Sequence, residues 1–167
     1  MGQLGRLVEL GAADLHALQA LFERCAAFFQ LVQGAPPRPD QAERWLHQEN
    51  VPGRAPGDKV VFGLLDDEER LVGAVDVTAD HPLVGEYWLG TMILEPTLRG
   101  VGMGAGFHAA VLAWVRGRGA QGVQLCVQQE NAGALRFWAR EGYQETGLAC
   151  QQAGGREQVV VKMRRAL

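Results

Sequence analysis

The amino-acid sequence predicts a mixed α/β fold over a single domain, residues 1–167, with a mostly antiparallel central sheet, flanking helices and one parallel pair of strands. From Lys59 onward, short apolar segments separated by turns replace the helical period, which predicts antiparallel strands. A strand, a glycine-rich turn, a helix and a second strand then follow between residues 87 and 127, and such a unit forms a right-handed parallel crossover. A chain of 167 residues is close to the size of one domain and can bury a substantial core.

The N-terminal third predicts one short strand followed by helices. The strand covers Arg6–Leu10, and apolar residues then recur at helical spacing from Leu15 to Phe29. Three prolines within residues 34–39 end this helix. Asp40, with Glu43 three residues later, indicates the start of a short helix through Leu46, and residues 50–57 are expected to form a loop.

The remaining elements follow from apolar runs and the turn residues between them. The predicted strands are Val60–Leu65, Leu71–Thr78, Tyr87–Leu94, Val123–Val127, Tyr143–Cys150 and Gln158–Met163. An amphipathic stripe predicts a helix from Met103 to about Arg118, closed by Gly117 and Gly119. Asn131 opens the last helix, which runs to Glu141, and Gly154-Gly155 forms the final turn.

Composition excludes several classes of function. The net charge of −3 and the scattered basic residues do not favour nucleic-acid binding. The three cysteines are far apart, which disfavours a disulfide framework and favours a reducing, cytoplasmic location. The four histidines show no metal-ligand spacing, so we expect no metal site. No signal-peptide core and no apolar run of membrane-spanning length is present, so no membrane association is expected.

The most informative stretch is Arg99-Gly100-Val101-Gly102-Met103-Gly104. Glycines at every second position let a chain turn tightly and direct successive N–H groups at one anion, and the following helix adds its positive end. A phosphate-bearing ligand or close packing alone would each explain the turn. The dinucleotide fingerprint fits by letter, but five residues separate strand from glycines and the next acidic residue, Glu130, comes too late. A Walker-type loop is excluded because no Gly-Lys-Ser/Thr follows.

Two motifs together resemble the GNAT (GCN5-related N-acetyltransferase) superfamily. Leu94-x-Pro96-x-x-Arg99-x-x-Gly102-x-Gly104 is similar to its acetyl-CoA pyrophosphate loop. Asn131-x-x-Ala134-x-x-Phe137-Trp138-x-x-x-Gly142-Tyr143 is similar to its next helix and strand. The order of the predicted elements also matches over essentially the whole chain.

This resemblance implies a cofactor site and a parallel strand pair that is splayed around the pantetheine arm. Backbone groups of Met92, Ile93 and Leu94 would pair with the pantetheine amides. Asn131 would hydrogen-bond the arm, and Trp138 would pack beside it. The pyrophosphate would be held by Arg99 and by the N–H groups of Gly100, Val101, Gly102, Met103, Gly104 and Ala105. Acetyl-CoA would be the cosubstrate, and no metal would be needed.

The implied chemistry is attack by an amine on a thioester, which requires removal of a proton. Backbone N–H groups at the splay, Leu94 first among them, could polarise the thioester carbonyl. Glu86 is the leading candidate base because alternation puts it on the strand face of Trp88, Gly90 and Met92, although a solvated strand end is an equal interpretation. Asp76, an acid inside an apolar strand, is the second candidate, unless it only faces water.

Two positions depart from the family pattern. Many members have Tyr, the acid that protonates the thiolate, where this chain has Trp138, and an indole is no practical acid. Some members carry a Glu base where this chain has Cys126.

The expected function is an N-acetyltransferase that moves an acetyl group from acetyl-CoA to a primary amine by direct attack in a ternary complex. The alternative is a non-catalytic acyl-CoA-binding or regulatory module on the same fold. The acceptor would be a small-molecule amine or a protein amine, and a homodimer is left open. Phe28-Phe29 and Pro36-Pro37 occupy positions where the family forms the acceptor wall, although an aromatic pair also suits the core. Acidic residues near the acceptor would favour polyamines.

Overall fold

The computed structural model describes residues 5–47 and 58–167, so the loop predicted for residues 50–57 lies outside the described residues. Its helices are α1 (Leu15–Arg24), α2 (Ala26–Gln33), α3 (Gln41–His47), α4 (Met103–Arg116) and α5 (Ala132–Arg140), with single 3-10 turns η1 (Ala12–Asp14) and η3 (Pro96–Leu98). Its strands are β1 (Arg6–Glu9), β2 (Lys59–Leu65), β3 (Leu71–Ala79), β4 (Glu86–Leu94), β5 (Gly122–Gln128), β6 (Gln144–Ala153) and β7 (Arg156–Ala166).

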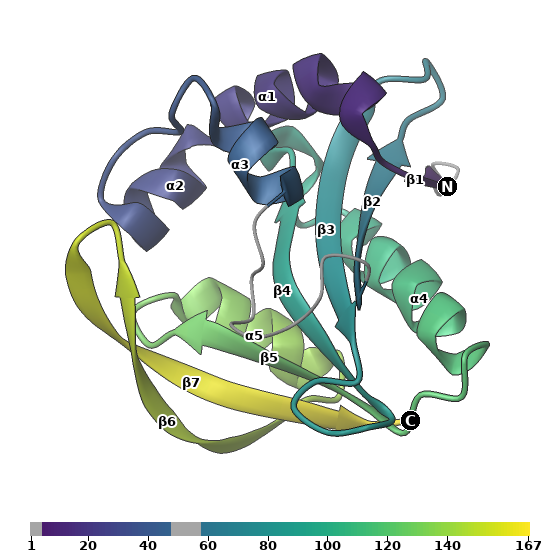
Figure 1. Cartoon of the computed structure of the whole chain (residues 1–167), viewed down its shortest axis with the longest axis vertical. Coiled ribbons are helices and arrows are strands. Elements are labelled where there is room, and N and C mark those ends of the chain that lie inside the picture. The colour runs from purple at the N-terminus through teal and green to yellow at the C-terminus, as the bar shows by residue number, and fades with distance from the viewer. Residues whose placement is uncertain (1–4, 48–57) are drawn as a thin grey trace.

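The strands form one seven-stranded sheet in the order β1-β2-β3-β4-β5-β7-β6 (Figure 1). Every neighbouring pair is antiparallel except β4 and β5, which are parallel and are joined through α4. The predicted mixed, mostly antiparallel sheet with one parallel crossover is therefore confirmed.

The two faces of the sheet carry separate hydrophobic clusters. On one face, α4 and α5 pack against β2–β5 and β7 through a cluster that includes Phe107, Val111 and Trp138. On the other face, α1, α2 and α3 cover β2–β4 through Leu18, Phe22 and their neighbours. Figure 1 shows α1 and α3 at the upper ends of β3 and β4, and α2 next to the tip of the β6–β7 hairpin. The Gln158 amide fixes that contact by donating to the Val32 carbonyl at 2.6 Å.

Strand predictions were confirmed to within a few residues, but the predicted helix over residues 15–29 was wrong in one respect. The backbone leaves helical geometry at Cys25, which has φ −99° and ψ 25°, and this residue separates α1 from α2. Cys25 is fully buried, and its Sγ lies 3.8 Å from the Leu94 carbonyl oxygen. The apolar period continues across the break, so periodicity alone could not reveal it.

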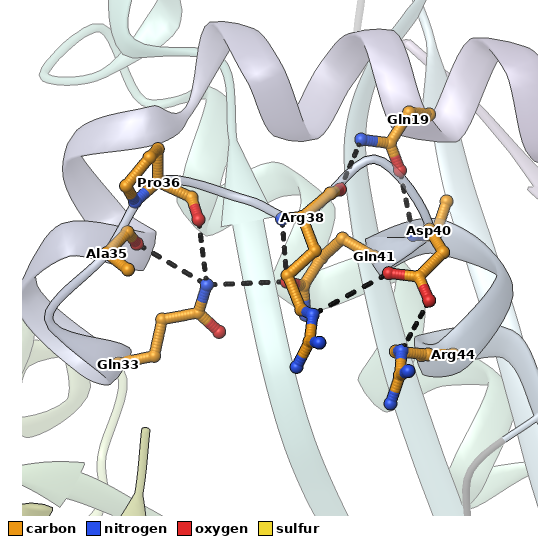
Figure 2. A network of polar contacts seen from close by, with 9 residues as sticks. Gln19, Gln33, Ala35, Pro36, Arg38, Asp40, Gln41 and Arg44 are labelled. Carbon is orange, nitrogen blue, oxygen red and sulfur yellow. Dashed lines mark hydrogen bonds and ion pairs between the residues drawn. The ribbon is translucent and has the colours of Figure 1, made fainter. Parts of the chain in front are cut away.

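Glutamine side chains hold the proline-containing connection between α2 and α3 (Figure 2). The Gln33 amide nitrogen donates to the Pro36 carbonyl at 3.1 Å. The Gln19 side chain donates to the Arg38 carbonyl at 2.8 Å and accepts from the Ala42 N–H at 2.9 Å. Because prolines lack N–H groups, side chains from α1 and α2 supply the bonds that order this connection.

A β-bulge interrupts β4 opposite Asp76. Val75 pairs with Met92 and Val77 pairs with Leu89, so Gly90 and Thr91 together oppose one residue of β3. The extra residue reverses the alternation of side chains. Leu89 and Met92 therefore both contact the cluster beneath α4.

This reversal corrects the expected face of Glu86. Tyr87 and Leu89 point toward α4, so Glu86 and Trp88 point to the opposite face, whereas Met92 lies on the α4 face. The prediction that Glu86 and Met92 share a face was wrong because the alternation on which it rests does not continue through a bulge.

Among the described residues, no helix is long and apolar enough to cross a membrane.

Candidate active site

The glycine-rich turn presents a row of backbone donors at the N-terminus of α4. Gly100 and Gly102 have φ of 78° and 85°, a left-handed conformation that favours glycine. A Cβ atom at either position would meet open space, so these two glycines are not required for close packing. Within the described residues, no N–H of residues 100–105 donates to another backbone group outside regular helix hydrogen bonding. Six successive donors at the positive end of a helix fit a diphosphate.

Arg99 and Gly104 connect this turn to its neighbours. Arg99 Nε donates to the Leu94 carbonyl at 3.0 Å, while the residue stays largely exposed. Gly104 lies in the first turn of α4, where an added Cβ would be 3.4 Å from the Phe137 ring and 3.8 Å from the Leu94 side chain. The structure thus brings together the turn, the end of β4 and α5.

The parallel strands β4 and β5 separate soon after they meet. Their pairing covers Glu86, Tyr87 and Trp88 of β4, opposite residues 122–124 of β5, and does not continue toward Leu94. Beyond this point, the edge of β4 that faces β5 is left for another partner.

Backbone alternation decides which predicted residues face that edge. Thr91 N donates to Asp76 and Glu95 N donates to the Val72 carbonyl, so residues 91, 93 and 95 direct their N–H groups toward β3. The intervening Met92 and Leu94 direct their N–H groups toward the gap between β4 and β5, which we call the splay. Of the three residues predicted to pair with a pantetheine arm, Ile93 therefore uses its backbone for β3.

Asp76 lies on β3, directly opposite the bulge in β4. It is fully buried, and its Oδ1 accepts the Thr91 N–H at 2.8 Å. The interpretation that Asp76 only faces water was wrong. By stabilising an N–H that lacks a regular strand partner, this carboxylate maintains the bulge.

Glu86 lies at the closed end of the splay, where β4 and β5 still pair. Its Oε2 accepts from Arg164 Nε at 3.0 Å and from Gln124 Nε2 at 2.9 Å, and its Oε1 accepts from Arg164 Nη2 at 2.5 Å. Hydrogen bonds from Arg164 and then Gln124 hold the pKa of the Glu86 carboxyl below its usual range, against the opposing effect of burial. Glu86 is only 7% exposed, so a solvated strand end does not describe it.

Asn131 and Trp138 lie on α5. The Asn131 side-chain oxygen accepts the Ala134 N–H at 3.1 Å and caps the helix, which leaves the amide nitrogen as a donor. Trp138 is 8% exposed and stacks edge-on against Phe137, with ring centroids 4.8 Å apart. The last helix thus begins after the predicted Asn131 and carries Trp138.

A buried polar chain lies behind Trp138 and was not predicted. His108 Nδ1 lies 2.8 Å from Glu141 Oε2, and His108 Nε2 lies 3.0 Å from the Tyr143 hydroxyl. Burial, partly opposed by Glu141, lowers the pKa of His108. In its neutral form, His108 donates to Glu141 and accepts from Tyr143. Its place in the apolar stripe of α4 was the one available sequence signal, because its partners lie 33 and 35 residues away.

The described residues contain no group of three or more His, Cys, Asp or Glu side chains arranged to hold a metal ion.

Comparison with known proteins gives one matching family model and several similar folds. The model of the acetyltransferase (GNAT) family matches residues 15–143. No curated protein matches the sequence. The fold is similar to that of an acetyltransferase from Thermus thermophilus, at a TM-score of 0.75, 20% identity and 100% coverage of both chains.

Two further solved structures have a similar fold. The ribosomal-protein-alanine N-acetyltransferase from Brucella melitensis has a TM-score of 0.72 at 20% identity and covers 97% of this chain and 99% of its own. The spermidine N-acetyltransferase from Vibrio cholerae, solved with CoA and spermine, has a TM-score of 0.74 at 19% identity and covers 98% of this chain and 95% of its own. At these identities the likeness shows the fold.

Proposed function

Because this chain belongs to the acetyltransferase (GNAT) family, we propose that it is an acetyl-CoA-dependent N-acetyltransferase acting on a primary amine by direct attack in a ternary complex. The observation that carries the proposal is the row of N–H groups at residues 100–105, beside the open edge of β4. Diphosphate recognition needs such donors together with close backbone approach. Arg99 is exposed beside them and adds positive charge.

The open edge of β4 suits the pantetheine arm that is attached to the diphosphate of CoA. Met92 and Leu94 offer backbone groups along this edge, and Asn131 and Trp138 approach from α5. An arm that starts at the turn and pairs with Leu94 and then Met92 runs toward the bulge. The thioester at its far end would therefore lie nearer to Met92 and Thr91 than to Leu94. We accordingly assign the carbonyl-polarising N–H to Met92, in place of Leu94.

Acetyl-CoA supplies the thioester, whose C–S bond breaks as the amine nitrogen forms a C–N bond and loses its proton. Asp76 and Glu86 are the two proposed proton acceptors. Asp76 opposes the bulge directly, whereas Glu86 lies five positions before Thr91 along β4, roughly 15 Å away. Position therefore favours Asp76, and Glu86 would act only through ordered water. Trp138 packs beside the arm, and water protonates the leaving thiolate.

The proposed acceptor is an amine of a small molecule or of a protein. The neighbouring structures bear the names of protein-alanine and spermidine acetyltransferases. Both a small amine and a protein amine therefore remain proposals for this chain, as does a homodimer. The cytoplasmic location also stays a prediction.

The test is steady release of free thiol from acetyl-CoA in the presence of a broad amine panel, with acetylated products identified by mass. We expect at least one amine to give multiple turnovers. Binding of acetyl-CoA without thiol release above the amine-free control would instead support the non-catalytic acyl-CoA-binding module, for which the missing Tyr at Trp138 is the motivating observation.

A further inference from the structure

One face of β5 and β7 is mostly polar, apart from the buried Val160, and is not part of either hydrophobic cluster. Alternate residues of these strands, such as Leu125 and Met163, pack beneath α4 and α5. The side chains between them point to the opposite face. Those nearest the splay are Gln124, Cys126, Gln128, Lys162 and Arg164, each at least partly exposed.

An acceptor reaches the splay from this polar face. The N-terminus of α4, where the diphosphate is proposed to bind, belongs to the helix layer on the other face of the sheet. The cofactor therefore enters from the α4 side and leaves the opposite side to the acceptor. Trp88 and Asp76 lie on that acceptor side as well.

The charged groups on the acceptor side differ in whether they form an ion pair. Arg164 and Glu86 neutralise each other through two hydrogen-bonded oxygens. Asp76 is buried and engaged with the Thr91 N–H. Lys162 is exposed, and within the described residues no carboxylate forms an ion pair with it.

The surroundings of Lys162 leave its ammonium accessible. Its cross-strand partners are Cys126 on β5, which has a small side chain, and Gly147 on β6, which has none. The end of α2 contacts β7 at Gln158 and Arg156, four and six residues before Lys162 along the strand. Arg164 is the next residue on the same face, so a second cation lies beside Lys162.

We infer that Lys162 binds an acidic oxyanion of the acceptor, so that the acetyl acceptor is a small amino acid-like molecule with both a primary amine and a carboxylate or related acid. This inference rests on the proposed function. A carboxylate at Lys162 would satisfy the uncompensated cation and hold the amine at the splay. A polyamine would instead place a second ammonium against Lys162.

The first experiment compares matched acceptors. The purified 167-residue protein would be assayed with acetyl-CoA and a panel of α-, β- and γ-amino acids, the carboxamide of each, spermidine, and an amidated tripeptide with an acidic second residue. We expect the best free acid to exceed its own carboxamide by about 10-fold or more in kcat/KM. A preference for the tripeptide over every free amino acid would assign the acid to a peptide and overturn the small-molecule inference.

The second experiment changes Lys162. Lys162→Gln should lower kcat/KM for the free acid by about 10- to 100-fold, mainly through KM, because a charge-assisted hydrogen bond is lost. The carboxamide and the KM for acetyl-CoA should be unchanged, and Lys162→Arg should retain most activity. Arg116→Gln, which removes an exposed cation at the distant C-terminal end of α4, is the matched control and should behave as wild type.

The outcomes separate the two proposals. Turnover restricted to carboxamides or polyamines, or an equal effect of Lys162→Gln on acid and carboxamide, overturns this inference and leaves acetyl transfer intact. No turnover with any amine, while acetyl-CoA binds, overturns the proposed function and this inference together.

Discussion

At the scale of single residues, the carboxylates near the splay differ in what they can do. Glu86 accepts hydrogen bonds from Arg164 and Gln124 at both oxygens, which makes it a weak proton acceptor. Asp76 accepts a backbone hydrogen bond from Thr91 at the bulge. Catalytic bases must lie within hydrogen-bond reach of the proton or one water away, so distance along β4 weighs against Glu86.

This difference predicts the order of two substitutions. Asp76→Asn should lower kcat by about 10² or more, since the amide keeps the Thr91 hydrogen bond but cannot take a proton. Glu86→Gln should lower kcat less, and acetyl-CoA affinity measured by calorimetry should be unchanged in both. Glu69→Gln, which breaks only the exposed ion pair with Arg6, is the control.

The reverse order, with kcat lost in Glu86→Gln and retained in Asp76→Asn, would make Glu86 the base. Because hydrogen bonds from Arg164 lower the pKa of Glu86 from its usual 4.5, its ionisation should appear in the kcat/KM profile only below that pH. An ionisation near pH 7 that Glu86→Gln abolishes would contradict this assignment.

At the scale of elements, the glycine before α4, Gly102, has a counterpart after the helix, Gly119, with a similar backbone conformation. Gly102 and Gly119 have φ of 85° and 77°, and a Cβ atom would meet open space at both. Alanine at either position should destabilise the fold by a similar amount, about 1–2 kcal/mol. Only Gly102 lies beside the proposed diphosphate. Comparing the two alanine substitutions therefore distinguishes the effect of backbone strain from the effect of lost ligand contact.

We expect Gly102→Ala to weaken CoA binding by about 10-fold or more, because it obstructs close backbone approach and disturbs the N–H row. Gly119→Ala should bind CoA as the wild type does. Calorimetric titration of both folded variants with CoA measures this. Equal CoA affinities of the two variants would show that the diphosphate does not bind at this turn. Gly104→Val is a less selective probe, since its Cβ would face Phe137.

At the scale of the whole molecule, the His108 chain joins α4 to the end of α5 and the start of β6. Glu141 and Tyr143 hold the two ring nitrogens, and the Trp138 ring lies 5.2 Å from His108 between centroids. The helix that follows the glycine-rich turn is thereby tied to the helix that carries Trp138. A charged imidazole would have to be accommodated within this buried cluster.

This arrangement predicts a pH dependence of stability. Since burial lowers the pKa of His108 from its usual 6.5, the unfolded chain binds a proton below pH 6.5 that the folded chain does not. The contribution of His108 to the free energy of unfolding should therefore be fully present above pH 6.5. Below pH 6.5 the free energy of unfolding should fall, by at most about 1.4 kcal/mol per pH unit from this group. Denaturant titrations of wild type and His108→Gln between pH 5 and 8 measure it.

The difference between the two stability curves isolates His108 from other titrating groups. It should narrow as pH falls below 6.5, because only the wild type loses this contribution. Parallel curves over the whole range would show that His108 does not link protonation to folding.

The sequence by itself determined the order of elements, the parallel crossover and the glycine turn before α4. These are local properties, since periodicity, glycines and prolines act within a few residues. The two motifs at Leu94–Gly104 and Asn131–Tyr143 also sufficed for the family, because their spacing lies within single supersecondary units.

Tertiary structure alone decided which side chains meet. Asp76 meets Thr91, Arg164 meets Glu86 from 78 residues away, and a bulge turns Met92 to the opposite face. The break at Cys25 likewise lies within an unbroken apolar period. Such pairings depend on strand register and on contacts between distant segments, and no pattern within one segment encodes them.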